Sequence, residues 1–408
     1  MIPDDLLHTA AYRRDPAPAW RRLRHDAPIW HDPVADRWVV TRYDDVLAIF
    51  RDAETYGVGR PYRRFSEQIG STLVNLDGPA HRQRRAIVAP ELVGRRIDGI
   101  RPLIGRRVGQ LFAAWPVRGE MDARAAVADR LPLLVIADLL GLAERDHEAF
   151  ARHSAVILAG LGGDPGEAAR GRDAHAALAA LFEHAIADAE TADTRDDGLI
   201  SAIVRARVDG DGLTVDEVRS FISLLLVAGG ETTGLAIANA WAVLAGRPDV
   251  QTILVADDDP GILDAFIAEA LRRDGPVIAE DREVRRDVDW YGATVPAGAT
   301  IRAFIGSANR DETVFADPDR FDPWRSDLHV GKPSRAGGRG ADGRAGHLTF
   351  GAGDHFCLGY QLAHAELTAS TRALLDRWPR FEPAEPWPAA TVALELMRHV
   401  DELVLRSA

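Results

Sequence analysis

The sequence predicts a mainly α-helical fold with small β-sheets, and two observations support this. Helical patterning covers most of the 408 residues, whereas stretches that alternate apolar and polar residues are few. Hydrophobic residues make up 46% of the chain, which is ample for a packed core. Because no segment separates two regions of different composition, we expect a single domain over residues 1–408.

The β-rich part is expected at about residues 28–60 and 284–305. The segment RWVVTRYDDVLAIF indicates a strand over Arg37–Thr41 and then a helix from near Tyr43. The segment VDWYGATVPAGATIRAFIGSANR indicates a β-hairpin around Gly292. The remainder of the chain is expected to be helical.

One long helix is predicted in the middle of the chain. Thr214 and Glu217 form a capping box at its start, and Gly246 with Pro248 marks its end. A helix of about 30 residues spans roughly 45 Å. Because it is apolar nearly all round, it is predicted to cross the interior.

The middle of this helix, AGGETT, combines two glycines with a carboxylate. Two helical glycines cost about 1 kcal/mol each relative to Ala, and a buried carboxylate costs more unless it is paired or neutralised. One interpretation is a mild kink, with Glu231 on the surface and the threonine hydroxyls bonded to carbonyls one turn earlier. The other is that small residues admit a flat group, beside which Glu231 and Thr232 handle protons. The sequence leaves both open.

Charge and composition exclude several classes of protein. A net charge of −13 argues against broad nucleic-acid binding. Apolar runs such as Leu224–Ala228 are far shorter than the roughly 20 residues of a membrane span, and the N-terminal segment has no apolar stretch of signal-peptide length. One cysteine cannot form an intrachain disulfide, which fits a reducing compartment. We therefore expect a soluble, cytoplasmic protein that does not bind membranes.

Two pairs of charged residues have helical spacing. Glu269 and Arg272 lie at i, i+3, where they can pair, although most such pairs are solvated. His81 and Arg85 lie at i, i+4 on one helical face. They form either a basic surface stripe or two donors for an anionic group.

The segment FGAGDHFCLG contains Cys357, the single cysteine. A buried structural thiol is one interpretation. A nucleophile needs a base, and His355 two residues away in a glycine-rich loop is not the usual arrangement. Zinc requires several Cys or His ligands, whereas one thiolate suits the axial position of haem iron. The glycines would let backbone N–H groups approach a flat macrocycle and the sulfur.

Together these motifs resemble those of the cytochrome P450 superfamily, the haem-thiolate monooxygenases. FGAGDHFCLG is similar to the cysteine loop of that family, and the resemblance covers essentially the whole chain. The other motifs occur in the family's order and spacing at Ala228–Thr232, Glu269 with Arg272, Arg320, and His81 with Arg85. The chain is most similar to the soluble bacterial members.

The resemblance implies a triangular-prism fold with haem b (iron protoporphyrin IX) between the central helix and the cysteine loop with its following helix. Cys357 would be the axial ligand. The cofactor-binding residues implied are His81, Arg85, Ala228, Gly229, Arg282, Phe350, His355, Cys357 and Gly359. Of these, the His and Arg side chains would hold the haem propionates.

The resemblance also implies a catalytic pair and a structural network. Glu231 and Thr232 would deliver protons during the reduction of dioxygen. Glu269, Arg272 and Arg320 would form a buried network behind the cysteine loop.

The implied substrate pocket is mostly apolar, which indicates a hydrophobic small molecule. Its residues would be Phe65, Leu225, Val277, Ile278, Ala279, Leu396 and Met397. Three arginines in the first pocket loop (Arg60, Arg63 and Arg64) suggest an anionic substrate or one tethered to an acidic carrier protein.

The expected reaction inserts one oxygen atom of O2 into a substrate, as in secondary metabolism, with electrons from NAD(P)H through ferredoxin reductase and ferredoxin. The alternative is oxidative coupling or desaturation on the same fold. A non-catalytic haem-binding sensor is an alternative of another class, against which Glu231 and Thr232 argue. A cysteine hydrolase lacks a convincing base.

The sequence departs from the family at two places. His364 stands where many relatives have Arg. The Gly- and Arg-rich segment Val330–His347 is longer than in many relatives. Its Arg335, Arg339 and Arg344 either meet an acidic ferredoxin or belong to a disordered, Arg-rich loop.

Overall fold

The computed structural model describes residues 2–63, 66, 70–160, 165–191, 198–208, 210–257, 259–385, 391–393 and 396–408. Its contacts divide the chain into two compact units. Unit 1 comprises Met1–Arg64, Leu235–Cys357 and Trp378–Ala408, and unit 2 comprises Phe65–Gly234 and Leu358–Arg377. The single domain expected from the sequence stays a prediction.

The main sheet of unit 1 has five strands in the order β1-β2-β8-β5-β3. Its strands are β1 (Ile29–Asp32), β2 (Arg37–Val40), β3 (Tyr56–Gly57), β5 (Glu280–Val284) and β8 (Thr300–Ala303). β2 and β8 are parallel, and the other neighbours are antiparallel. The sheet therefore joins the two chain regions in which the sequence predicted strands.

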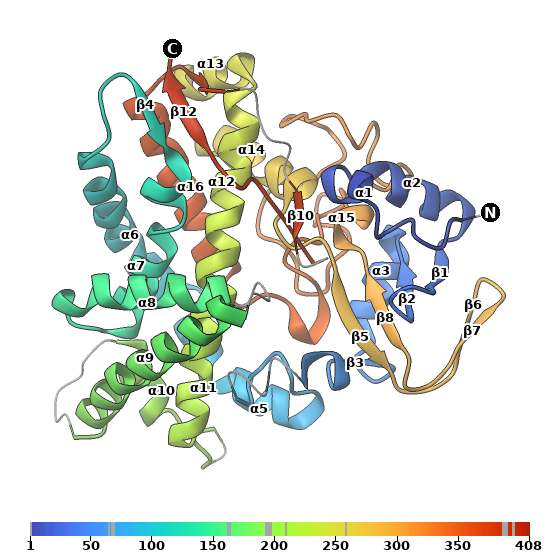
Figure 1. Ribbon diagram of the computed structural model, residues 1–408, viewed down its shortest axis with the longest axis horizontal. Coiled ribbons are helices and arrows are strands. Elements are labelled where there is room, and N and C mark those ends of the chain that lie inside the picture. The colour runs from blue at the N-terminus through green and yellow to red at the C-terminus, as the bar shows by residue number, and fades with distance from the viewer. Residues whose placement is uncertain are drawn as a thin grey trace. The chain divides into compact units, whose positions relative to one another are not determined.

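Helix α3 (Tyr43–Arg51) follows β2 directly, as predicted. Its first turn contains Asp44 and Asp45 and its last turn Arg51, so both ends carry charges that favour the helix dipole. The β6–β7 hairpin (Val288–Trp290 and Ala293–Val295) continues from β5 and leads back to β8 (Figure 1). Tyr291 (φ 50°) and Gly292 (φ 80°) form its turn, and two left-handed residues are what a tight two-residue turn requires.

The remaining elements of unit 1 are short helices and strands. The strands pair as β9 with β12 and β10 with β11, both antiparallel. These elements are α1 (Ala10–Arg14), α2 (Ala17–Asp26), η1 (Arg60–Tyr62), α13 (Pro248–Ala256), α14 (Pro260–Asp274), α15 (Ile305–Ala308), η6 (Gly353–His355), β9 (Phe381–Pro383), β10 (Thr391–Ala393), β11 (Met397–His399) and β12 (Val404–Ser407).

Unit 2 is almost entirely helical, and α7 is buried on nearly all its faces. Its elements are α5 (Gly78–Val88), η2 (Ala89–Glu91), α6 (Arg95–Ala113), β4 (Glu120–Asp122), the π turn η3 (Arg124–Ala128), α7 (Leu131–Leu140), η4 (Glu144–Asp146), α8 (His147–Gly160), α9 (Pro165–Thr191), α10 (Leu199–Arg205), α11 (Val215–Leu225), η5 (Leu226–Glu231) and α16 (Tyr360–Arg377). Together the two units confirm the mainly α-helical fold with small sheets.

The predicted central helix is one helical run in three parts. It consists of α11, the π turn η5 and α12 (Thr232–Ala245). The capping box is present: Glu217 N–H donates to Thr214 Oγ1 (3.2 Å), and Thr214 N–H donates to Glu217 Oε2 (2.8 Å). The run is long and apolar enough to cross a membrane, but 67% of its most apolar window is buried inside the protein. It is therefore of the core type found in soluble proteins.

The Gly- and Arg-rich segment before the cysteine loop is folded onto α3. Tyr43 Oη donates to the carbonyls of Gly346 (2.6 Å) and Gly338 (3.1 Å), and Arg51 Nη2 donates to Gly337 O (3.1 Å). Ala345 is buried in the same core as the sheet. These contacts argue against the expectation of a disordered loop and fix the start of the cysteine loop.

Candidate active site

The cysteine loop is a tight backbone arrangement in unit 1. The N–H of Cys357 donates to Phe350 O (2.9 Å), and the Cys357 side chain is half-buried. Gly351 (φ 68°) and Gly353 (φ 69°) adopt left-handed conformations that favour glycine. Gly353 also approaches the carbonyl of Phe50 so closely that a Cβ would clash with it. The glycines are therefore needed both for the turn and for packing against α3.

A buried ion pair lies behind this loop. Arg272 Nε and Nη2 donate to the two carboxylate oxygens of Glu269 at 2.6 and 2.7 Å, and both side chains are fully buried. Arg272 Nη1 donates to the carbonyls of Asn309 (2.7 Å) and Pro318 (2.9 Å). The side-chain oxygen of Asn309 in turn accepts the N–H of Leu348 (2.7 Å). A chain of hydrogen bonds thus connects the Glu-x-x-Arg helix α14 to the residues that precede Phe350.

The prediction that Arg320 is the third member of this buried network is wrong. The side chain of Arg320 is 69% exposed, and its carboxylate neighbour is Asp322 at 4.0 Å. Arg325, with a 5% exposed side chain, contacts Glu269 Oε1 at 3.3 Å instead and lies over the ring of Phe315. Both arginines lie in the irregular segment that follows α15, and no helical or strand spacing distinguishes them. The two arginines differ in how deeply the fold buries their side chains, which the local sequence does not determine.

Arg282, which the resemblance implies would hold a haem propionate, lies on strand β5 in unit 1. The guanidinium of Arg282 is buried and lies 5.3 Å from the ring centre of Phe50, the residue whose carbonyl contacts Gly353. Arg282 Nη1 donates to Asp281 O (2.8 Å) and approaches Tyr62 Oη (3.5 Å). His355, at the end of η6, is half-buried. Arg282 and the cysteine loop therefore both contact Phe50, the first through its ring and the second through its carbonyl.

The other two predicted cations lie on α5 in unit 2. His81 is 1% exposed and Arg85, one turn later, is half-buried. Their neighbour Arg84 points elsewhere and pairs with Glu217 at the start of the central helix, with Nε to Oε1 at 2.7 Å. The helix therefore separates one arginine that anchors α11 from a His–Arg pair on another face.

A π turn interrupts the central helix where the sequence places AGGETT. Gly229 and Gly230 face α7: a Cβ on Gly230 would lie 2.5 Å from Leu133 Cδ2, and one on Gly229 would lie 3.2 Å from Ile136 Cδ1. Ala228 nevertheless stays exposed. Single π turns inside α-helices are frequent at functional sites. The glycines thus allow close helix packing on one side and leave a small-residue surface on another.

The two predicted proton-handling residues flank the end of this π turn. Thr232 Oγ1 donates to Ala228 O (2.6 Å), the back-bonding that the structural interpretation of AGGETT expected. Glu231 is half-buried rather than on the surface. Burial raises its pKa, nearby Arg124 opposes this shift and Asp129 adds to it. Glu231 therefore holds a proton at higher pH than an exposed glutamate.

Five of the predicted substrate-facing residues come together in unit 1. Ile278 N–H donates to Leu396 O (2.8 Å), and Val277 pairs with Met397 in an antiparallel bridge. Ala279 continues the first of these segments. Leu225 ends α11 in unit 2, and Phe65 lies outside the described residues.

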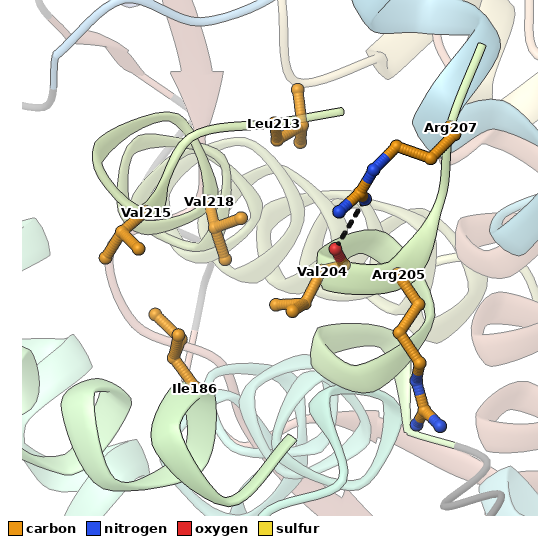
Figure 2. A pocket seen from close by; sticks show the side chains of 7 residues that line it. All are labelled: Ile186, Val204, Arg205, Arg207, Leu213, Val215 and Val218. Carbon is orange, nitrogen blue, oxygen red and sulfur yellow. Dashed lines mark hydrogen bonds between the residues drawn. The ribbon is translucent and has the colours of Figure 1, made fainter. Parts of the chain in front are cut away.

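A cavity of about 410 Å³ opens in unit 2 (Figure 2). Val215 and Val218 of α11 line it together with Ile186 of α9, and Arg207 donates to Val204 O beside it (2.8 Å). None of the predicted catalytic, cofactor-binding or substrate-facing residues lines this cavity. It is therefore not the expected substrate pocket.

The donor set around Cys357 fits a cofactor that brings its own metal ligands. In the described part of the chain, the residue group able to hold a metal ion consists of Asp138, Glu144 and His147, without Cys357. That group already surrounds a cation, because Arg107 donates to Asp138 (2.6 Å) and to Glu144 (2.8 Å). A single cysteine thiolate is a sufficient protein ligand for haem iron, whose porphyrin supplies four nitrogens.

Comparison with known proteins identifies the family. The sequence profile described as Cytochrome P450 matches residues 261–386. The cyclomarin C epoxidase CymV of Salinispora arenicola is 33% identical, over 89% of this chain and 88% of that protein. The cytochrome P450 monooxygenase PikC of Streptomyces venezuelae is 33% identical, over 90% and 85%. Substrate-free CYP109E1 from Bacillus megaterium superposes with a TM-score of 0.86 at 28% identity, over 97% and 99%.

The chain belongs to the cytochrome P450 family. It is a P450 monooxygenase of the bacterial type with the P450 fold. Its cofactor is haem b with an axial cysteine thiolate, and Cys357 is the single cysteine of the chain. The family, fold class, enzyme class and cofactor expected from the sequence are thereby confirmed.

Proposed function

We propose that this protein is a cytoplasmic enzyme that inserts one oxygen atom of O2 into a hydrophobic intermediate of secondary metabolism. Electrons reach it from NAD(P)H through ferredoxin reductase and ferredoxin. The observation that supports catalysis rather than haem binding alone is Glu231, a half-buried carboxyl with a raised pKa beside Thr232. A haem-binding sensor has no need of a buried proton donor at a π turn.

When bound, the haem would supply the iron chemistry that activates dioxygen, and a thiolate ligand would promote that chemistry. Cys357 provides this thiolate. His81, Arg85, Arg282 and His355 would hold the haem propionates, because each can donate N–H groups to a carboxylate. The glycines of the cysteine loop let its backbone approach the ring.

Glu231 and Thr232 move the protons that the reduction of dioxygen consumes. The Thr232 hydroxyl donates its own hydrogen to Ala228 O, so its oxygen is available to accept a hydrogen bond. Burial favours the protonated form of Glu231, which makes it the proton donor. General acid catalysis of this kind contributes about 10²–10⁴-fold to a rate.

The substrate is an apolar molecule because its predicted walls are aliphatic or thioether side chains, such as those of Val277, Leu396 and Met397. Relatives of this chain include an epoxidase named for cyclomarin C and a P450 solved with corticosterone. Arg60 and Arg63 are exposed on and after η1 and provide positive charge for an acidic carrier protein that presents the substrate.

The ferredoxin docks beside the cysteine loop. Arg335 contacts this loop through Asp354 (Nη2 to Oδ1, 2.8 Å) and through Gly353 O (3.1 Å). Arg335, Arg339 and Arg344 lie on one folded segment and add positive charge to a chain whose net charge is −13. We expect these arginines to attract an acidic partner to this face.

Turnover under labelled dioxygen tests the proposal. Compounds that shift the haem absorption band are incubated with the enzyme, a ferredoxin, its reductase, NADPH and ¹⁸O₂. We expect a product that carries one ¹⁸O atom. A coupled or desaturated product without label contradicts oxygen insertion, and haem-loaded protein that turns over no bound compound contradicts catalysis.

A further inference from the structure

We propose that Asn239 is a positioning residue that fixes the substrate-facing walls of unit 1 relative to the central helix. This inference rests on the proposed function, because it concerns the residues that face the substrate there. Asn239 lies on α12 and is 3% exposed. No motif in the sequence singles it out.

The side-chain amide of Asn239 makes three hydrogen bonds, all to backbone groups. Its Nδ2 donates to Asp274 O (2.9 Å) and to Arg398 O (3.0 Å), and its Oδ1 accepts the N–H of Val400 (3.2 Å). A carboxamide offers two N–H donors and a carbonyl acceptor on one rigid plane. Asn239 therefore uses both donors and its acceptor to join α12 to two other segments.

These two segments are the ones that carry predicted substrate-facing residues. Asp274 is the last residue of α14, whose terminal carbonyl has no partner within the helix. The chain continues from there to Val277, Ile278 and Ala279. Arg398 belongs to β11, directly after Met397. Each bond of Asn239 thus fixes the backbone within a few residues of a predicted substrate contact.

The two segments also hold each other. Arg398 N–H donates to Pro276 O (2.8 Å), and Ile278 N–H donates to Leu396 O (2.8 Å). Between them the side chain of Arg398 pairs with Asp274 (Nη1 to Oδ1, 2.7 Å). The two substrate-facing segments are therefore joined by a short ladder of hydrogen bonds, and we expect them to move together.

The carboxylate at the base of this ladder is held charged. Burial raises the pKa of Asp274, but the guanidiniums of Arg273, Arg398 and Arg310 outweigh burial and lower it below its usual range. The ion pairs therefore persist at neutral pH and make the ladder internally rigid. Of the contacts described here, those of Asn239 connect this rigid piece to the central helix.

Loss of the amide would leave two buried carbonyls and one N–H without their partner. Unsatisfied buried polar groups are costly, so we expect the ladder to shift away from α12 when the amide is lost. A displacement of about 1 Å in a substrate wall can change a rate by about 10²-fold. The effect of replacing Asn239 is therefore expected in the pocket more than in global stability.

Gln251 on α13 offers a matched control in the same unit. Its Nε2 donates to Leu244 O (2.9 Å) and Phe381 O (2.8 Å), and its Oε1 accepts the N–H of Phe381 (3.2 Å). It is as buried as Asn239 and also makes three bonds to backbone groups. Its partners belong to α12 and β9, neither of which carries a predicted substrate contact. Gln251→Ala removes the same number of hydrogen bonds away from the substrate walls.

The test measures the affinity of haem-loaded protein for two ligands that bind the iron, imidazole and 4-phenylimidazole. Binding of each ligand is monitored by the shift of the haem absorption band. Imidazole reports the iron site, whereas the phenyl ring of the second ligand also touches the pocket walls. We expect Asn239→Ala and Asn239→Asp to weaken 4-phenylimidazole by about 10-fold and imidazole by less than about 2-fold, which corresponds to a specific change of about 1.4 kcal/mol. Gln251→Ala should change neither affinity.

Two outcomes overturn the inference. Unchanged affinity of both ligands in the Asn239 variants shows that the walls do not depend on the amide. An equal loss in Asn239→Ala and Gln251→Ala shows a general effect of destabilisation. If Asn239→Ala does not fold, Asn239→Asp decides, because it keeps the acceptor for Val400 and loses both donors. Neither failure affects the proposed oxygen insertion, which labelled dioxygen tests separately.

Discussion

Two glutamates on helices of this protein, Glu269 and Glu231, lie in opposite environments. Glu269 in unit 1 is fully buried and accepts from Arg272, Arg325 and the backbone N–H of Asp322 (3.0 Å). Glu231 in unit 2 is half-buried at a π turn, where burial outweighs the attraction of the nearest arginine and raises its pKa. The same side chain thus pairs with two arginines in one place and, as we propose, carries protons in the other.

The difference shows that the number of arginine partners decides whether a buried carboxyl group has a structural or a chemical role. A carboxylate with two guanidiniums keeps its charge and serves as an anchor, and removal of a partner is costly because it leaves a buried charge. A carboxyl whose pKa is raised by burial keeps its proton at higher pH than an exposed carboxyl does. The following variants test each side of this comparison.

The largest effect is expected on stability, at the buried network of Glu269. Arg325→Ala removes one guanidinium from Glu269 and should cost about 3 kcal/mol of unfolding free energy, as for other broken buried ion pairs. Urea unfolding of the haem-loaded protein measures this. Arg320→Ala is the matched control on the same segment, and because Arg320 is exposed it should change stability by less than about 0.5 kcal/mol. Equal losses in both variants would contradict the network described here.

A slightly smaller effect is expected on the rate of product formation, at Glu231. Glu231→Gln keeps the size of the side chain but cannot release a proton, so product formation should fall by about 10²-fold. The raised pKa of Glu231 predicts that wild-type turnover falls as pH rises through that pKa, since the acid form is lost. Steady-state rates from pH 5 to 9 measure both effects. A variant that keeps the wild-type rate and the same alkaline decline would exclude Glu231 as the donor.

A third glutamate, Glu366 on α16, sharpens the comparison. It is 2% exposed, and burial raises its pKa well above the usual value. Above pH 4.5 the unfolded chain releases this proton while the folded protein keeps it, so stability falls as pH rises toward the folded pKa. The slope for one group is at most about 1.4 kcal/mol per pH unit.

Glu366→Gln should remove this pH dependence, because glutamine is neutral at every pH. We therefore expect the variant to be more stable than the wild type at pH 8 and close to it at pH 5. Urea unfolding at both pH values provides the measurement. A variant that is less stable by the same amount at both values would show that Glu366 is charged and compensated, like Glu269.

Local spacing predicted much of this fold and site. The capping box of the central helix, strand β2 with the helix after it, and the Glu269–Arg272 pair depend on residues three or four positions apart or on simple alternation. The cysteine loop is likewise a contiguous motif. These features could be predicted because the residues that form them are neighbours in the chain.

The remainder depends on packing between distant segments. The π turn places Gly230 against Leu133, almost a hundred positions earlier, and the choice of Arg325 over Arg320 depends on which side chain the fold buries. Asn239 bonds to residues 35 and 159 positions away. No window of sequence contains both partners of such contacts, so their roles emerge only from the structure.

The central claim is that Cys357 is the axial thiolate ligand of the haem, and one measurement tests it most directly. The absorption spectrum of the reduced protein under carbon monoxide reports the axial ligand. We expect the long-wavelength band that thiolate ligation gives in the wild type and its loss in Cys357→Ser, while folding measured by circular dichroism is retained. A wild type that binds haem without this band, or a serine variant that keeps it, would contradict the account.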